Sequence, residues 1–141
     1  MITLNKTMNS SLGRWAPVVF WMAFIFFLSS RPSFPDLGVK LLLDKALRIA
    51  GHFIQYAVLA FLVSRAVAPN GERSNLWIGL VLAWCAAYAV SDEWHQSFIP
   101  NRTADVLDWV VDMAGALVGC VVYRRKMRAE GRTRIAEREI A

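Results

Sequence analysis

Four long apolar runs, separated by short charged segments, dominate this sequence. They cover residues 15–30, 49–64, 76–91 and 106–123. The only Asp, Glu, His, Lys or Arg residues within them are His52, Asp108 and Asp112. Hydrophobic residues make up 56% of the chain, above the share of roughly 45–50% that is usual in soluble domains. The sequence therefore predicts an all-α integral membrane protein, a bundle of four transmembrane helices in one domain.

Each apolar run is short for a membrane span. A helix of about 16 residues is ~24 Å long, whereas the hydrocarbon core of a bilayer is ~30 Å thick. We therefore expect each helix to extend into its polar flanks, which brings ionisable side chains inside the membrane boundary. No small-residue cleavage site follows the first run, so we interpret it as a retained helix and not as a signal peptide.

Lysine and arginine are divided unequally between the two sides that four spans create. The N-terminus, the 65–75 connection and the C-terminal tail together hold eleven, and the opposite side holds five. Because basic residues concentrate on the cytoplasmic side of membrane proteins, we expect both termini in the cytoplasm, with segments 31–47 and 92–105 outside. The predicted location is the inner or cytoplasmic membrane, which the chain crosses in several passes.

The predicted organisation is a cytoplasmic N-terminus (1–14), a transmembrane domain (15–123) and a basic cytoplasmic tail (124–141). The net charge of +5 comes mostly from this tail. Topology accounts for that charge, so we expect no nucleic-acid partner; the partners expected are membrane lipids, and the tail is able to contact anionic ones.

The two cysteines and the absence of common motifs bear on whether the chain has a disulfide, a cofactor or a metal site. Cys85 and Cys120 lie at different depths of their predicted helices, which disfavours a disulfide, and we expect both to be small packing residues. The chain contains no CxxC, HExxH, GxSxG or glycine-rich phosphate loop. We therefore expect no cofactor and no metal site.

Polar residues gather where the predicted helices reach the outer side. Arg48, His52 and Tyr56 follow one another at intervals of four residues, which aligns them on one helix face. The other polar residues at this level are Ser29, Ser30, Arg31, Tyr88, Ser91, Asp92, Glu93, His95, Gln96, Asp105, Asp108 and Asp112. Charges at this depth are unfavourable unless they are paired or hydrated, so we expect these side chains to contact one another.

Asp112 lies deepest among the acids. It precedes Gly115 and Gly119, a pair of small residues that lets a neighbouring backbone approach closely. An acid that faces such a packed interior requires a cationic partner. The available partners are Arg48, Arg102 and His52, and we prefer the two arginines.

These polar residues also allow a purely structural interpretation. A buried polar network would fix the register of the helices without binding anything. Glu93 and His95, taken alone, would be solvated loop residues. The number of polar groups that converge at one depth favours a functional site, since ionisable residues within membrane spans usually serve function.

Two segments resemble VanZ-like proteins. Residues 48–56, RIAGHFIQY, match that family's pattern RxxxHFxxY. Residues 88–119, YAVSDEWHQSFIPNRTADVLDWVVDMAGALVG, are similar to its second block. That block consists of DExxQ, a Phe two residues later, PxR, acids six and ten residues after the Arg, and a GAxxG run. The resemblance covers residues 15–123.

The end of the first run resembles the family as well, with Ser29 and Ser30 followed by Pro32. Arg31 stands where a Gln is common, and Gln55 stands where an acid is often found. The family is named for a protein linked to resistance to the glycopeptide teicoplanin. The resemblance therefore implies a role in the cell envelope, a cell-wall-related or lipid-linked ligand, and a contribution to glycopeptide resistance.

We expect the polar residues to form an outward-facing binding pocket. The residues assigned to ligand binding are Arg48, His52, Tyr56, Asp92, Glu93, Gln96, Arg102, Asp108 and Asp112. An anionic head group of a lipid-linked cell-wall precursor would suit Arg31, Arg48 and Arg102, because arginine binds phosphate oxygens bidentately. A glycopeptide is the other expected ligand.

The alternative is an intramembrane enzyme, a hydrolase or transferase that acts on a lipid head group. Asp92, Glu93, Asp108 and Asp112 would supply a general base or metal ligands, with His52 as the proton carrier. No strict metal-ligand spacing supports a metal. A small transporter or flippase is favoured least, because the chain shows no internal repeat and no broken helix.

Overall fold

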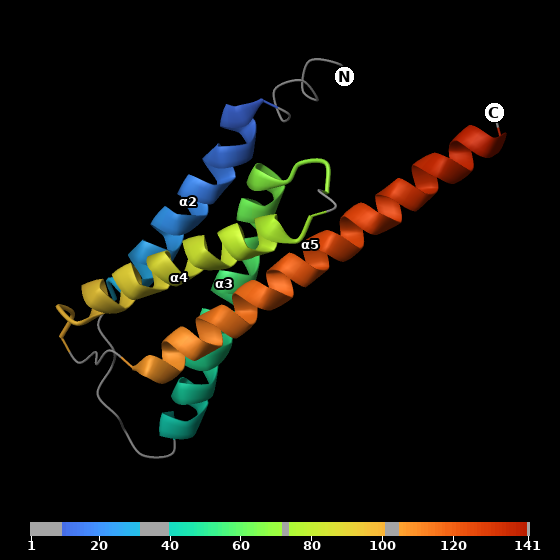
Figure 1. The fold of residues 1–141 in the computed structure, drawn as a ribbon. Coiled ribbons are helices and arrows are strands. Elements are labelled where there is room, and N and C mark those ends of the chain that lie inside the picture. Colours follow the sequence, from blue (N-terminus) through green and yellow to red (C-terminus); the bar gives the residue numbers. More distant parts are fainter. Residues whose placement is uncertain (1–9, 32–39, 72–73, 101–104, 141) are drawn as a thin grey trace.

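The computed structural model describes residues 10–31, 40–71, 74–100 and 105–140, apart from the side chains of residues 40–42, 44, 138 and 139. This part of the chain is helical and contains no strand. Its helices are α2 (Ser11–Ser29), α3 (Lys40–Val67), α4 (Leu76–Gln96) and α5 (Val106–Ile140). All four are long and apolar enough to cross a membrane, so the predicted all-α bundle is confirmed (Figure 1).

The helices extend beyond the apolar runs. Helix α3 starts at Lys40 and α4 ends at Gln96, so parts of the predicted outside segments 31–47 and 92–105 are helical. Helix α5 continues through the basic tail to Ile140. This confirms the expectation that each helix extends into its polar flanks, because a helix propagates by backbone hydrogen bonds, which form whether or not the added side chains are apolar.

Helix α3 lies at the centre of the bundle, packed along α5, and α2 packs on α3 and α4 (Figure 1). Gly115 and Gly119 of α5 face the backbone of α3. A Cβ atom added to Gly115 would collide with the carbonyl oxygen of Phe53, and one added to Gly119 would collide with that of Ala57. The two glycines therefore permit the close approach that the small-residue spacing predicted.

Helix α2 is hydrogen-bonded to α3 at a backbone carbonyl that a proline leaves without its helical partner. Pro17 lies inside α2 and has no N–H, which leaves the carbonyl of Gly13 without its usual helical partner. Arg65 of α3 donates to that carbonyl oxygen at 3.2 Å. Further along, the indole of Trp21 donates to the carbonyl oxygen of Gln55 at 2.9 Å. Two side chain–backbone bonds thus fix the register of α2 on α3.

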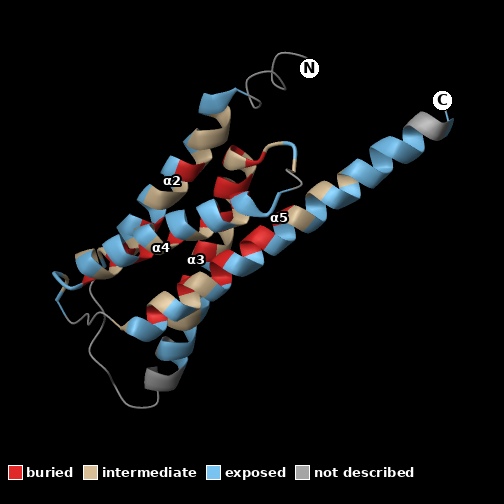
Figure 2. Cartoon of the chain, viewed as in Figure 1, coloured by how far each residue is buried: buried red, intermediate tan, exposed pale blue. Residues whose placement is uncertain are grey.

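Buried residues lie between the helices, and exposed residues cover the outer faces (Figure 2). Large apolar side chains such as Phe20 and Leu80 are exposed, as expected for surfaces that contact lipid tails. Cys85 and Cys120 are both buried and free, which confirms their prediction as packing residues without a disulfide. The core positions the polar ends of the helices, where the candidate site lies.

Candidate functional site

The first group of polar contacts joins α3 to α5. Arg48 donates from Nη1 to Oδ2 of Asp108 at 2.7 Å, and its Nη2 lies 3.9 Å from Oδ2 of Asp105. The Asp108 side chain is 1% exposed, whereas that of Arg48 is 34% exposed. A fully buried carboxylate is therefore neutralised by an arginine that reaches in from the edge of the bundle. The predicted contact between Arg48 and an acid of the fourth run is confirmed.

His52 lies one helical turn further along α3 and contacts both buried aspartates of α5. Its Nδ1 lies 3.0 Å from Oδ1 of Asp112, and its Nε2 lies 4.0 Å from Oδ2 of Asp108. All three side chains are buried. The four-residue spacing on both helices brings these groups into register. Among the described residues Asp112 thus pairs with His52 and not with Arg48, which corrects that part of the preference for an arginine.

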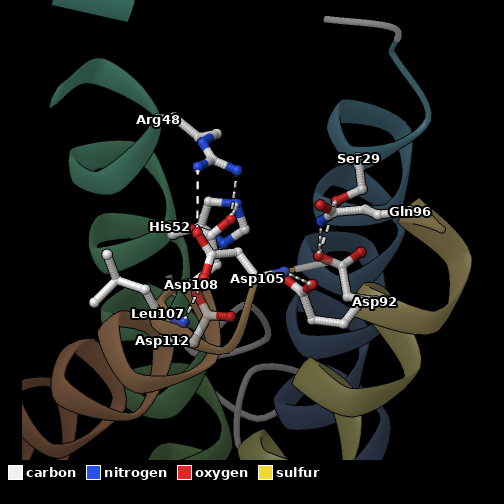
Figure 3. A network of polar contacts seen from close by, with 10 residues as sticks. Ser29, Arg48, His52, Asp92, Gln96, Asp105, Leu107, Asp108 and Asp112 are labelled. Carbon is white, nitrogen blue, oxygen red and sulfur yellow. Dashed lines mark hydrogen bonds and ion pairs between the residues drawn. The ribbon is translucent and has the colours of Figure 1, made fainter. Parts of the chain in front are cut away.

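The second group joins α2 to α4. Ser29, the last residue of α2, donates from Oγ to Oδ2 of Asp92 at 2.9 Å. Gln96 donates from Nε2 to the same Asp92 oxygen at 2.9 Å and to Oγ of Ser29 at 3.3 Å. All three side chains are buried. Figure 3 shows this group facing the Arg48 and His52 group across the end of the bundle.

Glu93 and Tyr56 lie between the two groups. Glu93 belongs to α4, not to a loop, and its Oε2 accepts a hydrogen bond from the backbone N–H of Asp105 at 3.0 Å. Tyr56 is fully buried, within electrostatic range of Asp92 and Asp112. We call these residues together the polar cluster: Ser29, Arg48, His52, Tyr56, Asp92, Glu93, Gln96, Asp105, Asp108 and Asp112.

Several buried oxygens of the polar cluster have no hydrogen-bond partner among the described residues. They are Oη of Tyr56, Oε1 of Glu93, Oδ1 of Asp108 and Oδ2 of Asp112. An unsatisfied buried polar atom destabilises a protein by about 1–3 kcal/mol. Among the residues of this region that the structure describes, acids also outnumber basic groups, since five carboxylates face one arginine and one histidine. The polar cluster can therefore accept additional hydrogen bonds, or a positive charge.

The acids of the polar cluster are divided between two helix pairs and do not converge on one point. Within the described ranges, no three His, Cys, Asp or Glu side chains are placed to hold a metal ion together. His52 is the group best oriented for proton transfer, because Asp112 holds its Nδ1 and thereby directs its Nε2. The arrangement offers an oriented imidazole and a set of acceptor oxygens.

Most of the residues predicted to bind a ligand are brought together in the polar cluster. Arg102 is the exception, because it lies outside the described residues. Ser29 and Asp105 were recognised as polar residues at this level but were not assigned to the site. Their contacts depend on how α2 is rotated against α4 and where α5 begins, and residue spacing within one helix shows neither.

Two residues near the polar cluster point elsewhere. Arg31 lies over the ring of Phe27, with Cζ 4.6 Å from the ring centroid. The ring of His95 stacks on Phe26 at 4.2 Å between centroids, and its Nε2 lies 3.0 Å from Oγ of Ser30. The interpretation of His95 as a solvated loop residue is wrong, because α4 continues past it and packs it against α2.

Comparison with known proteins identifies the family of this chain. A family model described as VanZ/LLP1 matches residues 14–127, which include all four apolar runs and the whole polar cluster. No curated protein and no solved structure shows a significant match. Segments 48–56 and 88–119, on which the resemblance rests, both lie within the matched region. The chain, a membrane protein with four apolar helices, therefore belongs to the VanZ/LLP1 family.

Proposed function

We propose that this VanZ-family membrane protein binds the head group of a lipid-linked component of the cell envelope through the polar cluster. The observation that carries the proposal is the set of unpaired buried oxygens on Tyr56, Glu93, Asp108 and Asp112. Buried polar groups in proteins are normally hydrogen-bonded. Donors supplied by a ligand would complete the network that the protein leaves unfinished among its described residues.

The contacts of the arginines support a ligand that donates hydrogen bonds. Arg48 is neutralised by Asp108, and Arg31 lies over Phe27. In the part of the chain that the structure describes, no arginine of the polar cluster lacks an acidic partner. Ammonium or sugar hydroxyl groups fit the excess of acceptors, so phosphate binding by Arg31 and Arg48 is not part of the proposal.

The proposed site faces the outer leaflet. The basis is the excess of lysine and arginine at the other end of the bundle, since that end of a membrane protein usually lies in the cytoplasm. At the outer leaflet the polar cluster would meet lipid-linked cell-wall precursors and glycopeptides. A contribution to teicoplanin resistance would follow from binding either the precursor or the antibiotic.

Cysteine labelling tests the orientation. In a background without Cys85 and Cys120, a cysteine placed at Ser97 should react with a membrane-impermeant maleimide added to intact cells. One placed at Ser74 should react only after permeabilisation. Both serines are exposed, whereas Ser33, another outside position, lies beyond the described residues. Labelling at Ser74 alone in intact cells would place the polar cluster at the cytoplasmic side.

A substitution of Glu93 tests the binding function. Glu93→Gln keeps an acceptor for the Asp105 backbone N–H but removes the charge at the unpaired oxygen. We expect the variant to protect a teicoplanin-sensitive host less than the wild type does, with little change in thermal unfolding. Glu130→Gln is the matched control, because this residue lies on the exposed part of α5, where Lys126 forms only a weak surface pair.

The outcomes separate the parts of the proposal. A Glu93→Gln variant that folds normally and protects as well as the wild type would contradict ligand binding by the polar cluster. A wild type that gives no protection would remove the antibiotic part. In that case, binding of lipid-linked components would be measured directly on purified protein.

One observation favours the enzyme as a second candidate. The contact between Asp112 and Nδ1 of His52 is the arrangement that orients an imidazole for general acid–base catalysis. If proton transfer by His52 is essential, Asp112→Asn alone should abolish function, because it removes the group that fixes the imidazole tautomer. If the site only binds a ligand, Asp112→Asn should reduce function in part, and Tyr56→Phe and Glu93→Gln should reduce it in part as well.

A further inference from the structure

A half-open cleft lies at the end of the bundle opposite to the polar cluster. It is bounded by Asn70 after α3, Trp77 in the first turn of α4, and the part of α5 from Tyr123 onward. Its volume is ≈ 370 Å³, in the lower part of the range of roughly 300–1,000 Å³ for ligand sites. Figure 1 shows the segment that directly follows α3, residues 68–71, beside α5, where α5 leaves the bundle. The size fits a lipid head group.

Contacts between the α3–α4 connection and α5 fix the walls of the cleft. Tyr123 donates to the carbonyl oxygen of Ala68 at 2.5 Å, and its ring meets that of Trp77 edge-on, 5.8 Å between centroids. Gly71 has a φ of 67°, a conformation that favours glycine. A Cβ atom on Gly71 would lie 2.8 Å from Cβ of Met127, so Gly71 lies directly against α5. These contacts join the described walls of the cleft to one another.

Two arginines give the cleft a positive charge. Arg124 and Arg128 line it from positions one helical turn apart on α5. Neither side chain forms a hydrogen bond or an ion pair with another residue that the structure describes, whereas the neighbouring Lys126 lies 3.9 Å from Glu130. The two guanidinium groups are thus available to an anion.

The position of these arginines along α5 matches the level of lipid phosphates. The apolar run of α5 ends at Tyr123, and seven basic residues follow between positions 124 and 138. Aromatic and basic side chains typically mark the membrane–water interface. Basic pockets between membrane helices bind anionic lipid head groups, and arginine matches the geometry of phosphate oxygens.

We propose that this cleft binds the phosphate of an anionic phospholipid such as phosphatidylglycerol. Arg124 and Arg128 hold the phosphate, the amide of Asn70 contacts the polar part of the head group, and Trp77 and Tyr123 form the apolar wall beside it. This site is separate from the polar cluster and does not depend on the ligand proposed there. A bound lipid would clamp α5 to the α3–α4 connection.

The test is a titration of the full chain in neutral detergent with short-chain phosphatidylglycerol, measured by native mass spectrometry. The reference titrations use short-chain phosphatidylcholine and soluble glycerol phosphate. Each arginine near an anionic lipid contributes about 1 kcal/mol, which corresponds to about fivefold in affinity. We therefore expect Arg124→Gln/Arg128→Gln to bind phosphatidylglycerol about 25-fold more weakly. The single variant Arg128→Gln, at an exposed position, should lose about fivefold.

The matched control is Arg125→Gln/Arg132→Gln, which removes the same charge from exposed positions that do not line the cleft. Its affinity for phosphatidylglycerol should stay within about twofold of the wild type. An equal loss in the control would show attraction by the basic tail as a whole and overturn the proposal. Equal binding of phosphatidylcholine, or glycerol phosphate binding as tightly as the lipid, would overturn it as well.

Discussion

Two tyrosines in the same bundle should respond in opposite ways to loss of the hydroxyl group. The Tyr88 hydroxyl donates to the carbonyl oxygen of Met22 at 2.6 Å, which ties α4 to α2. The Tyr56 hydroxyl is fully buried and has no partner among the described residues. Phenylalanine keeps the ring in both cases, so the two substitutions differ only in what the hydroxyl contributes.

The magnitudes follow from these contacts. Loss of a hydrogen bond within a membrane protein lowers the free energy of unfolding by about 0.5–2 kcal/mol, which we expect for Tyr88→Phe. Removal of an unsatisfied buried hydroxyl recovers about 1–3 kcal/mol, so Tyr56→Phe should raise the free energy of unfolding of the lipid-free protein. The free energies of unfolding of the two variants should therefore differ by about 1.5–5 kcal/mol.

The assay is reversible unfolding in mixed detergent micelles, followed by circular dichroism, with protein freed of native lipid. The same pair is then compared in polymer discs that retain the native membrane. If a head group donates to Tyr56 there, Tyr56→Phe should lose its advantage in the discs, while Tyr88→Phe should be destabilised in both. Equal destabilisation of both variants in lipid-free micelles would refute the reasoning, since it would mean that the Tyr56 hydroxyl is already bonded.

Two further pairs of substitutions test the packing and the buried charges. Gly115→Ala should lower the free energy of unfolding by about 1–3 kcal/mol or more, because the added methyl group meets the Phe53 carbonyl. Gly79→Ala, with open space around it, should raise the free energy of unfolding by about 0.5–1 kcal/mol. Equal effects in a detergent unfolding assay would contradict the close α3–α5 contact. Arg48→Met should lower the free energy of unfolding by about 3–5 kcal/mol, because it leaves the fully buried Asp108 without its cationic partner. Asp108→Asn should lower it less, since the half-buried Arg48 can be hydrated. A larger decrease for Asp108→Asn in the same assay would contradict this asymmetry.

The helices and much of the polar cluster were predictable from sequence because both depend on periodicity. The four apolar runs each became a helix, and the four-residue spacing of Arg48 and His52 placed both against α5. The small-residue pair at Gly115 and Gly119 indicated where the backbones meet. Each of these features depends on the spacing of residues along one helix, so the sequence alone predicts it.

The pairing between helices was not predictable in the same way. Asp112 pairs with His52, and Asp92 pairs with Ser29, because rotation and axial offset of neighbouring helices decide which groups meet. The cleft at the other end depends on the left-handed turn at Gly71, which no periodic pattern encodes. The extension of the helices into their flanks was expected, but the apolar runs do not show the residue at which each helix ends, since charged residues of the flanks join the helices through their backbone hydrogen bonds.

Native mass spectrometry of protein released from its own membrane tests most directly whether the polar cluster binds a head group. The wild type should carry a lipid-linked adduct that Arg124→Gln/Arg128→Gln retains and Tyr56→Phe/Glu93→Gln loses. Retention by the cleft variant separates this ligand from the phospholipid proposed at the opposite end. If the wild type carries no such adduct, or if Tyr56→Phe/Glu93→Gln carries it to the same extent, the polar cluster is a structural network and the claim is contradicted.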